Sequence, residues 1–300
     1  MLRRFKDGFT LVELSISIAF IAILSITITL LTTNIIASYQ RGLTLKQINT
    51  TGTDLINDIK SSISNSSSKN LTDLCGSTYA DESVREACEN DKAQNFVSLS
   101  RSATVTLNGE SIGVMPVYGA FCTGTYSYIW NSGYFFSGDH GVSLPAAKLI
   151  YKNEDGAQKT AENFRLLKLN DPSRSVCVAM TLNGSATSMN ETNYNPGVTE
   201  FSNEINISNL GLVSSDPIEL LDPNNEYDLA LYGLAVARPA QDSLTRNVLY
   251  SGYFILATIR GGININVDGD YCSAPSEYST TTTDYCAINK FNFAIQASGE

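Results

Sequence analysis

An apolar run near the start of the chain, residues 9–38, most constrains what it can fold into, because its only ionisable side chain is Glu13. A helix that spans a bilayer needs about 20 apolar residues, so this run is long enough. A secretory signal has an apolar region of roughly 7–15 residues, which is shorter. Arg3, Arg4 and Lys6 precede the run, no comparable run follows, and positive residues favour the cytoplasmic side. The sequence therefore predicts a single-pass membrane protein with a cytoplasmic N-terminus and an exported remainder.

Composition excludes some classes of function. The chain has 300 residues, enough for one large domain or two modest ones. Its 43% hydrophobic and 17% charged residues indicate a folded chain, and its formal net charge of -10 argues against a general nucleic-acid-binding protein.

The residues around the start of the run form the hexapeptide Gly8-Phe-Thr-Leu-Val-Glu13, which follows a short basic leader, residues 1–8. This segment resembles the class III signal of type IV pilins and related pseudopilins. The resemblance implies that a prepilin peptidase cleaves between Gly8 and Phe9 and methylates the new amine of Phe9. It is clear over residues 1–55, whereas the exported part is similar only in general organisation.

Glu13 stands where membrane insertion penalises a charge. A carboxylate at the bilayer centre costs about 2.5–3.5 kcal/mol on insertion scales, so such residues usually have a partner. Cleavage after Gly8 creates an amine one helical turn from Glu13, and the resemblance implies that Glu13 pairs with the N-terminal amine of a neighbouring subunit. On this interpretation its cost is offset only on assembly. The alternative is a plain signal anchor whose carboxylate lies near the interface.

The pattern becomes amphipathic over residues 39–64. Ile48, Leu55, Ile59 and Ile63 recur at spacings close to three and four, with Leu45 and Ile56 flanking them. This spacing predicts that the helix continues with one face packed on a sheet. The charged residues expected in solvent are Lys46, Asp54, Asp58 and Lys60. The polar residues 64–68 predict its end.

Gly42 and Gly52 lie within this long helix. Glycine weakens an isolated helix, so local melting is one interpretation. The other is that the glycines fit close contact between helix and sheet. The sequence leaves both open.

The remainder, residues 65–300, reads as an exported head rich in β-strands. Strands are predicted at residues 96–107, 126–136, 148–151, 164–169, 176–182, 229–237, 248–259, 263–267 and 288–297. Residues 183–209 are polar and predict a long loop or linker. The expected fold class is α+β: a long N-terminal α-helix, with a transmembrane half and an amphipathic half, packed on a predominantly antiparallel β-sheet head.

Six cysteines, an even number in an exported domain, predict disulfides: Cys75, Cys88, Cys122, Cys177, Cys272 and Cys286. Many connectivities exist, and the sequence does not choose among them. Short-range pairing gives Cys75–Cys88 and Cys272–Cys286 and leaves Cys122–Cys177. The resemblance adds weight to Cys272–Cys286, because many type IV pilins close a loop near the C-terminus with a disulfide.

The sequence shows no recognisable catalytic constellation. His140 is the only histidine, and no nucleophile elbow or phosphate-binding loop accompanies it. We therefore expect no enzyme activity and no cofactor. Asn266, Asp268 and Asp270 cluster oxygen ligands that calcium could use. They are also ordinary turn residues, which is the simpler interpretation.

These features predict a structural subunit, a minor pilin or tip component, of a type IV pilus or similar filament. Its expected partners are other pilin subunits, the prepilin peptidase and, before assembly, the membrane. Two alternatives remain: a type II secretion pseudopilin, and an adhesin whose head binds a host or surface ligand. An exposed aromatic patch would serve the adhesin, although these residues are more simply strand residues: Tyr126, Tyr128, Trp130 and Tyr134.

Overall fold

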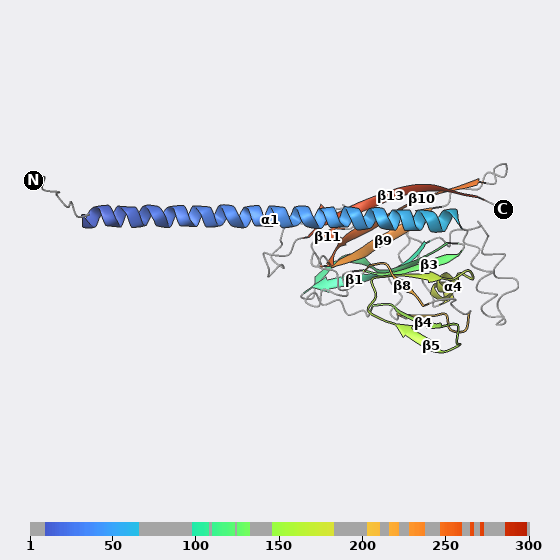
Figure 1. Ribbon diagram of the computed structural model, residues 1–300. Coiled ribbons are helices and arrows are strands. Elements are labelled where there is room, and N and C mark those ends of the chain that lie inside the picture. The colour runs from blue at the N-terminus through green and yellow to red at the C-terminus, as the bar shows by residue number, and fades with distance from the viewer. Residues whose placement is uncertain are drawn as a thin grey trace, which may run out of the picture. The chain divides into compact units, whose positions relative to one another are not determined.

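The computed structural model describes residues 10–65, 98–107, 110–123, 125–132, 146–182, 203–210, 216–221, 228–237, 247–259, 265–266, 271–272 and 286–298. The fold is α+β, with one long N-terminal apolar helix followed mainly by antiparallel strands (Figure 1). The chain divides into two compact units, Met1–Leu43 and Thr44–Glu300.

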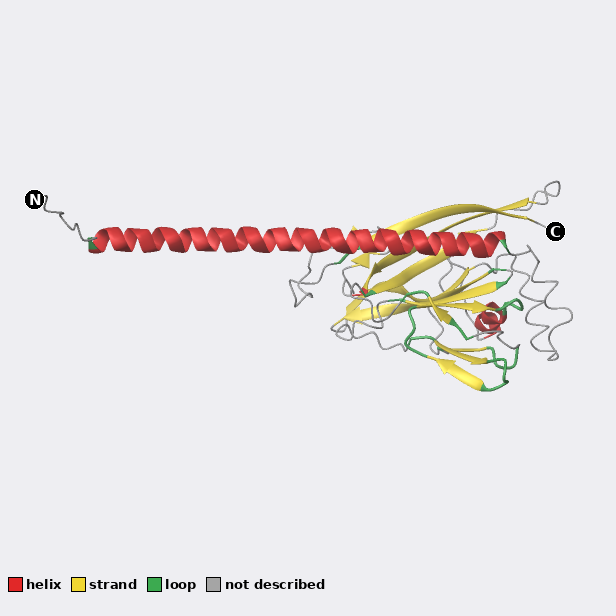
Figure 2. Ribbon diagram, in the orientation of Figure 1, coloured by secondary structure: helices red, strands yellow, loops and turns green. Residues whose placement is uncertain are grey.

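Helix α1, Leu11–Ser64, is 54 residues long and crosses the boundary between these units (Figure 2). It ends where the polar residues 64–68 begin, as the sequence predicts. Within the second unit, the four residues of the predicted apolar stripe are all buried: Ile48, Leu55, Ile59 and Ile63. Lys46 and Asp54 are exposed, as expected for the opposite face.

The largest sheet has the strand order β1-β2-β3-β6-β8 and is antiparallel throughout. Its strands are β1 (Ser98–Leu107), β2 (Glu110–Cys122), β3 (Tyr126–Asn131), β6 (Leu166–Asn170) and β8 (Ile218–Glu219).

Strand β2 was not predicted, because Pro116 and Gly119 interrupt its apolar pattern. The structure accommodates both residues locally. The register of the β1–β2 pair shifts next to Pro116, and proline is tolerated at such irregularities. A Cβ on Gly119 would lie 2.5 Å from the Leu99 carbonyl oxygen and 2.6 Å from the Trp130 ring, so this close approach requires glycine.

A second antiparallel sheet has the order β13-β10-β9. Its strands are β9 (Leu229–Ala237), β10 (Asn247–Thr258) and β13 (Ile288–Ser298), close to the predicted ranges. Strand β10 pairs with β13 from Asn247 to Ala257, whereas its pairing with β9 begins only at Ser251.

Two small sheets complete the described strands. One has the order β5-β4-β7, with β4 (Lys148–Lys152) antiparallel to β5 (Gln158–Ala161) and parallel to β7 (Glu204–Asn206). The other pairs β11 (Ile265–Asn266) with β12 (Tyr271–Cys272). Strand β7 lies inside the stretch predicted as a loop or linker, residues 183–209, of which residues 183–202 are outside the described residues.

The prediction of a strand at residues 176–182 is wrong, because this segment forms helix α4 (Ser175–Leu182). The carboxylate of Asp171 accepts hydrogen bonds from the backbone N–H groups of Ser175 (2.9 Å) and Val176 (3.1 Å) at the start of the helix. Asp171 is itself buried and also accepts a bond from Ser127 Oγ at 2.8 Å. A capping carboxylate thus starts a helix where the apolar pattern alone is ambiguous.

The hydrophobic core has two main parts. One lies around α4, β2, β4 and β6 and includes Cys177, Phe164 and Leu149. The other gathers the buried stripe of α1 with residues of both larger sheets. Its members from the strands and adjoining segments are Phe121, Tyr128, Trp130, Leu166, Leu221, Leu229, Leu231, Leu234, Val236, Phe254, Leu256, Ala287, Phe291 and Phe293.

Gly52 shows how closely α1 approaches this second cluster. A Cβ at this position would lie 2.1 Å from Cζ of Phe291 on β13, so only glycine fits without displacing the ring. The Phe291 ring stacks on Phe254 with centroids 5.1 Å apart. A Cβ on Gly42 would meet nothing within 4 Å. Of the two interpretations of these glycines, close helix–sheet contact explains Gly52 but does not apply to Gly42.

Candidate functional site

The predicted processing site is only partly described. Gly8 and Phe9 lie outside the described residues, which begin at Thr10. Glu13 falls in the first turn of α1, as the hexapeptide interpretation requires of a residue near the helix start.

Thr10 and Glu13 close the start of α1 with reciprocal hydrogen bonds. The Thr10 backbone N–H donates to Glu13 Oε2 at 3.0 Å, and the Thr10 hydroxyl donates to the same oxygen at 2.9 Å. The Thr10 hydroxyl oxygen also lies 3.3 Å from the Glu13 backbone nitrogen, completing a capping box. The pattern Thr-x-x-Glu is visible in the sequence, and recognising it would have identified this pair.

This capping box changes the interpretation of Glu13. The hexapeptide alone predicts that the charge of Glu13 is compensated only on assembly, whereas Thr10 already supplies two donors within the same chain. Both bonds go to Oε2. Among the described residues no donor reaches Oε1, so that oxygen is open to a further partner.

Helix α1 displays a long apolar surface within the first unit. Its large hydrophobic side chains between Leu11 and Tyr39 are between 44% and 84% exposed. This is the single described helix long and apolar enough to cross a membrane. A contiguous exposed apolar surface of this size marks a contact with lipid or protein.

Six serine and threonine hydroxyls on this surface bond carbonyl oxygens of their own helix. Thr27, Thr29 and Thr32 each donate to the carbonyl oxygen four residues earlier at 2.8 Å. Ser17 does the same toward Glu13, and Ser15 and Thr33 bond three residues back. Because these six hydroxyls do not need water, they can enter an apolar environment without being left unpaired.

The second unit contains a polar cluster that we call the helix latch: Asp58 and Ser62 of α1, Tyr128 of β3 and Lys168 of β6. The Tyr128 hydroxyl donates to Asp58 Oδ2 at 2.8 Å and lies 2.6 Å from Ser62 Oγ. Lys168 Nζ lies 2.6 Å from Asp58 Oδ1. The prediction that Asp58 takes the solvent holds only in part: its side chain is 32% exposed, and residues of two strands bind its carboxylate.

Burial and charge shape the chemistry of the helix latch. The Lys168 ammonium lies 4.4 Å from the centroid of the Tyr126 ring, in cation–π geometry. Burial raises the pKa of the Tyr128 hydroxyl well above its usual value, and the nearby Asp58 carboxylate adds to the rise. Tyr128 therefore stays protonated and keeps donating to Asp58 over the whole physiological range.

A second ion pair joins the two larger sheets. Arg165, just before β6, pairs through Nη1 with Asp228, just before β9. Asp228 has a φ of 49°, and its carbonyl oxygen accepts a hydrogen bond from the Ile259 N–H at 2.7 Å. These contacts place Asp228 in a structural role.

The aromatic-patch hypothesis is wrong for the two residues at its centre. Tyr128 and Trp130 are both fully buried in the second core cluster, and Tyr126 is half-buried beside Lys168. Tyr134 lies outside the described residues. The simpler interpretation, that these are strand residues partly in the core, is confirmed for Tyr128 and Trp130.

The remaining polar candidates are mostly not described. His140, Asp268 and Asp270 lie outside the described residues, and Asn266 ends strand β11. Within the described ranges no group of three or more metal-binding side chains occurs.

Two disulfides are present in the described residues. Cys122 at the end of β2 joins Cys177 in α4, with Cα atoms 6.3 Å apart. Cys272 of β12 joins Cys286 just before β13, with Cα atoms 5.8 Å apart. Both coincide with the pairs that short-range pairing gives. Cys75 and Cys88 lie outside the described residues.

Comparison of the chain with protein-family models, with curated proteins and with solved structures gives no match.

Proposed function

We propose that this chain is a structural subunit of a type IV pilus or pilus-like filament, most specifically a minor pilin or tip component. In this proposal a prepilin peptidase cuts after Gly8 and methylates Phe9, and the first part of α1 then packs among the helices of other subunits. The chain acts as no enzyme and uses no cofactor. It spans the membrane once before assembly, with its head on the outer side.

One observation carries this proposal: an exposed apolar helix begins two residues after Phe9 and contains a single carboxylate in its first turn. The satisfied hydroxyls support a segment that moves between lipid and protein surroundings. The open oxygen of Glu13 supports a contact with the amine of a neighbouring subunit.

The capping box suggests how Glu13 is tolerated before assembly. Thr10 holds one carboxylate oxygen while the subunit is stored in the membrane, and the neighbour's amine takes the other during assembly. Charge-assisted hydrogen bonds of this kind are roughly twice as strong as neutral ones. Thr10 and the amine therefore act in sequence on the same side chain.

The proposal is tested by shearing filaments from cells and measuring the chain in the filament fraction and in the membrane. We expect Glu13→Ala to lower the filament fraction at least tenfold while the membrane level stays unchanged, since the ion-pair partner is lost. Ser15→Ala is the matched control, because its hydroxyl bonds only its own helix. Absence of the wild-type chain from every filament fraction would overturn the proposal.

A further inference from the structure

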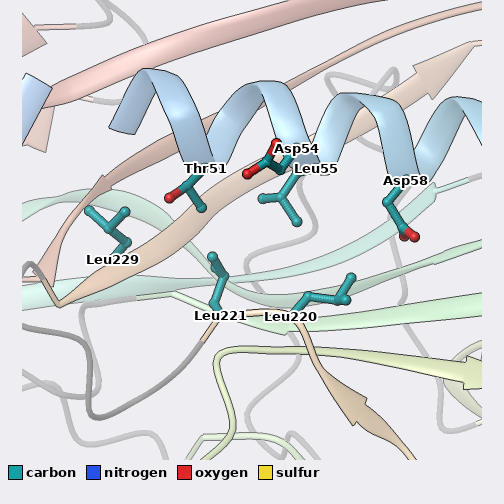
Figure 3. A pocket seen from close by; sticks show the side chains of 7 residues that line it. All are labelled: Thr51, Asp54, Leu55, Asp58, Leu220, Leu221 and Leu229. Carbon is teal, nitrogen blue, oxygen red and sulfur yellow. The ribbon is translucent and has the colours of Figure 1, made fainter. Parts of the chain in front are cut away.

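A groove in the second unit lies between α1 and the segment around β8 and β9. Its volume is about 360 Å³. Figure 3 shows the Asp54, Leu55 and Asp58 side chains on the α1 side, facing Leu220, Leu221 and Leu229. The groove therefore has leucine walls and two carboxylates one helical turn apart.

The two carboxylates differ in their partners. Asp58 belongs to the helix latch and is paired with Lys168 and Tyr128. Asp54 is exposed, and in the part of the chain that the structure describes it makes neither an ion pair nor a side-chain hydrogen bond. Because Lys168 neutralises Asp58 while no described cation pairs with Asp54, the groove lining keeps one unbalanced negative charge.

Size and chemistry restrict what can fill the groove. Its volume of about 360 Å³ is enough for one long side chain, its leucine walls favour apolar atoms, and the Asp54 carboxylate favours a cation. A long aliphatic side chain with a terminal cation meets both requirements. Its methylenes lie along the leucines, and its charged end reaches a carboxylate.

We propose that this groove receives a lysine or arginine side chain from a neighbouring subunit, with Asp54 as the carboxylate that binds it. Lys168 beside Asp58 shows that an ammonium group is accepted at the equivalent position one turn further along α1. That this side chain comes from a neighbouring subunit rests on the proposed function.

The first test measures whether the groove selects a cation. The full chain in detergent micelles, with methyl-labelled leucines, is titrated with n-butylammonium and with n-butanol, and the methyl resonances of the groove leucines are followed. We expect a saturable shift with n-butylammonium and about tenfold weaker binding of n-butanol, because the ammonium makes an ion pair with the carboxylate whereas the alcohol donates only a neutral hydrogen bond.

Variants assign this binding to one side chain. Asp54→Asn should weaken n-butylammonium binding about tenfold, because it removes the charge and leaves the walls intact. Glu154→Gln is the matched control, since Glu154 is exposed and remote from the groove lining. Equal binding of the alcohol, or unchanged binding in Asp54→Asn, overturns the proposal.

The second test identifies the source of the cation. In the filament-shearing assay, Asp54→Lys should lower the chain in filaments about tenfold, because two cations then face each other, and Glu154→Lys should not. If Asp54→Lys assembles normally although n-butylammonium binds, the groove takes small amines and the subunit is the wrong occupant. If the wild-type chain never enters filaments, the proposed function fails, while the titration still decides whether the groove selects cations.

Discussion

The two parts of helix α1 differ in where their apolar side chains go. Before Leu43 these side chains are exposed and the hydroxyls bond their own helix. After Thr44 one apolar stripe is buried, and its flank carries the helix latch. The comparison teaches that an apolar helix can form along its whole length, whereas the buried stripe of its second part is explained by the strands packed against it. The other part presents a surface that needs lipid or another protein.

The largest expected difference in stability is between an isoleucine truncated in the buried part of α1 and one truncated in its exposed part. Ile59→Ala removes a fully buried side chain and should lower the free energy of unfolding of the head by about 2–5 kcal/mol. Ile35→Ala changes a side chain that is 67% exposed and should stay within about 0.5 kcal/mol.

Denaturant unfolding of the full chain in detergent measures both variants. Trp130 is the only tryptophan and is fully buried, so its fluorescence reports the head. An equal loss of unfolding free energy in Ile59→Ala and Ile35→Ala would contradict the difference between the two parts of α1.

Gly52 and Gly42 test the same difference between the two parts of α1. Gly52→Leu places a side chain into the Phe291 ring and should cost the head about 1–3 kcal/mol through overpacking. Gly42→Leu meets nothing within 4 Å and should leave Trp130-detected unfolding unchanged. If Gly52→Leu were neutral, the close approach of α1 to β13 would be wrong.

Two tyrosines give a smaller, pH-dependent contrast: Tyr128 of β3, which contacts the second part of α1, and Tyr39, which lies in the first part. Tyr128→Phe removes the hydroxyl bonded to Asp58 and should cost about 1.5 kcal/mol near neutral pH. Tyr39→Phe, at an exposed position, should cost nothing measurable.

The sign of the pH dependence follows from burial. Because the pKa of Tyr128 is raised on folding, its contribution to stability is full below the unfolded pKa of about 10 and is lost as the pH rises above it. Tyr128→Phe should therefore flatten the loss of stability above about pH 10. Unfolding midpoints from pH 8 to 12 measure this, and an unchanged alkaline slope in Tyr128→Phe would count against the helix latch.

The smallest effect is expected at the start of α1. Thr10→Val removes the hydroxyl of the capping box and should weaken the first turn by about 1 kcal/mol, or roughly fivefold in amide hydrogen exchange. Thr29→Val, whose hydroxyl bonds within the helix, is the control. Exchange at residues 11–14 should rise only in Thr10→Val, with no change in Trp130-detected unfolding.

Hydrophobic periodicity was enough to predict some of these features. The buried stripe of α1 follows from spacings of three and four, and the end of α1 follows from the polar residues 64–68. The apolar runs of β9, β10 and β13 predict these strands. In each of these elements many residues repeat the same apolar pattern.

The segment 176–182 is apolar and too short for its periodicity to separate a helix from a strand, and the Asp171 cap that starts the helix is a local signal outside that periodicity. Features that depend on distant contacts could not be read from the sequence. Asp58 reads as a solvent residue until Tyr128 and Lys168 are brought to it from other strands. The capping box at Thr10 differs, because its signal is local and readable.

The most direct test of the central claim is mass spectrometry of the N-terminal peptide from cell-associated protein, with and without the prepilin peptidase of the cell. The account predicts a mature chain that begins at Phe9, carries one added methyl group, and disappears when the peptidase is absent. An intact Met1, or cleavage beyond Leu31, would contradict it and leave an anchored or secreted β-rich protein whose first helix has another partner.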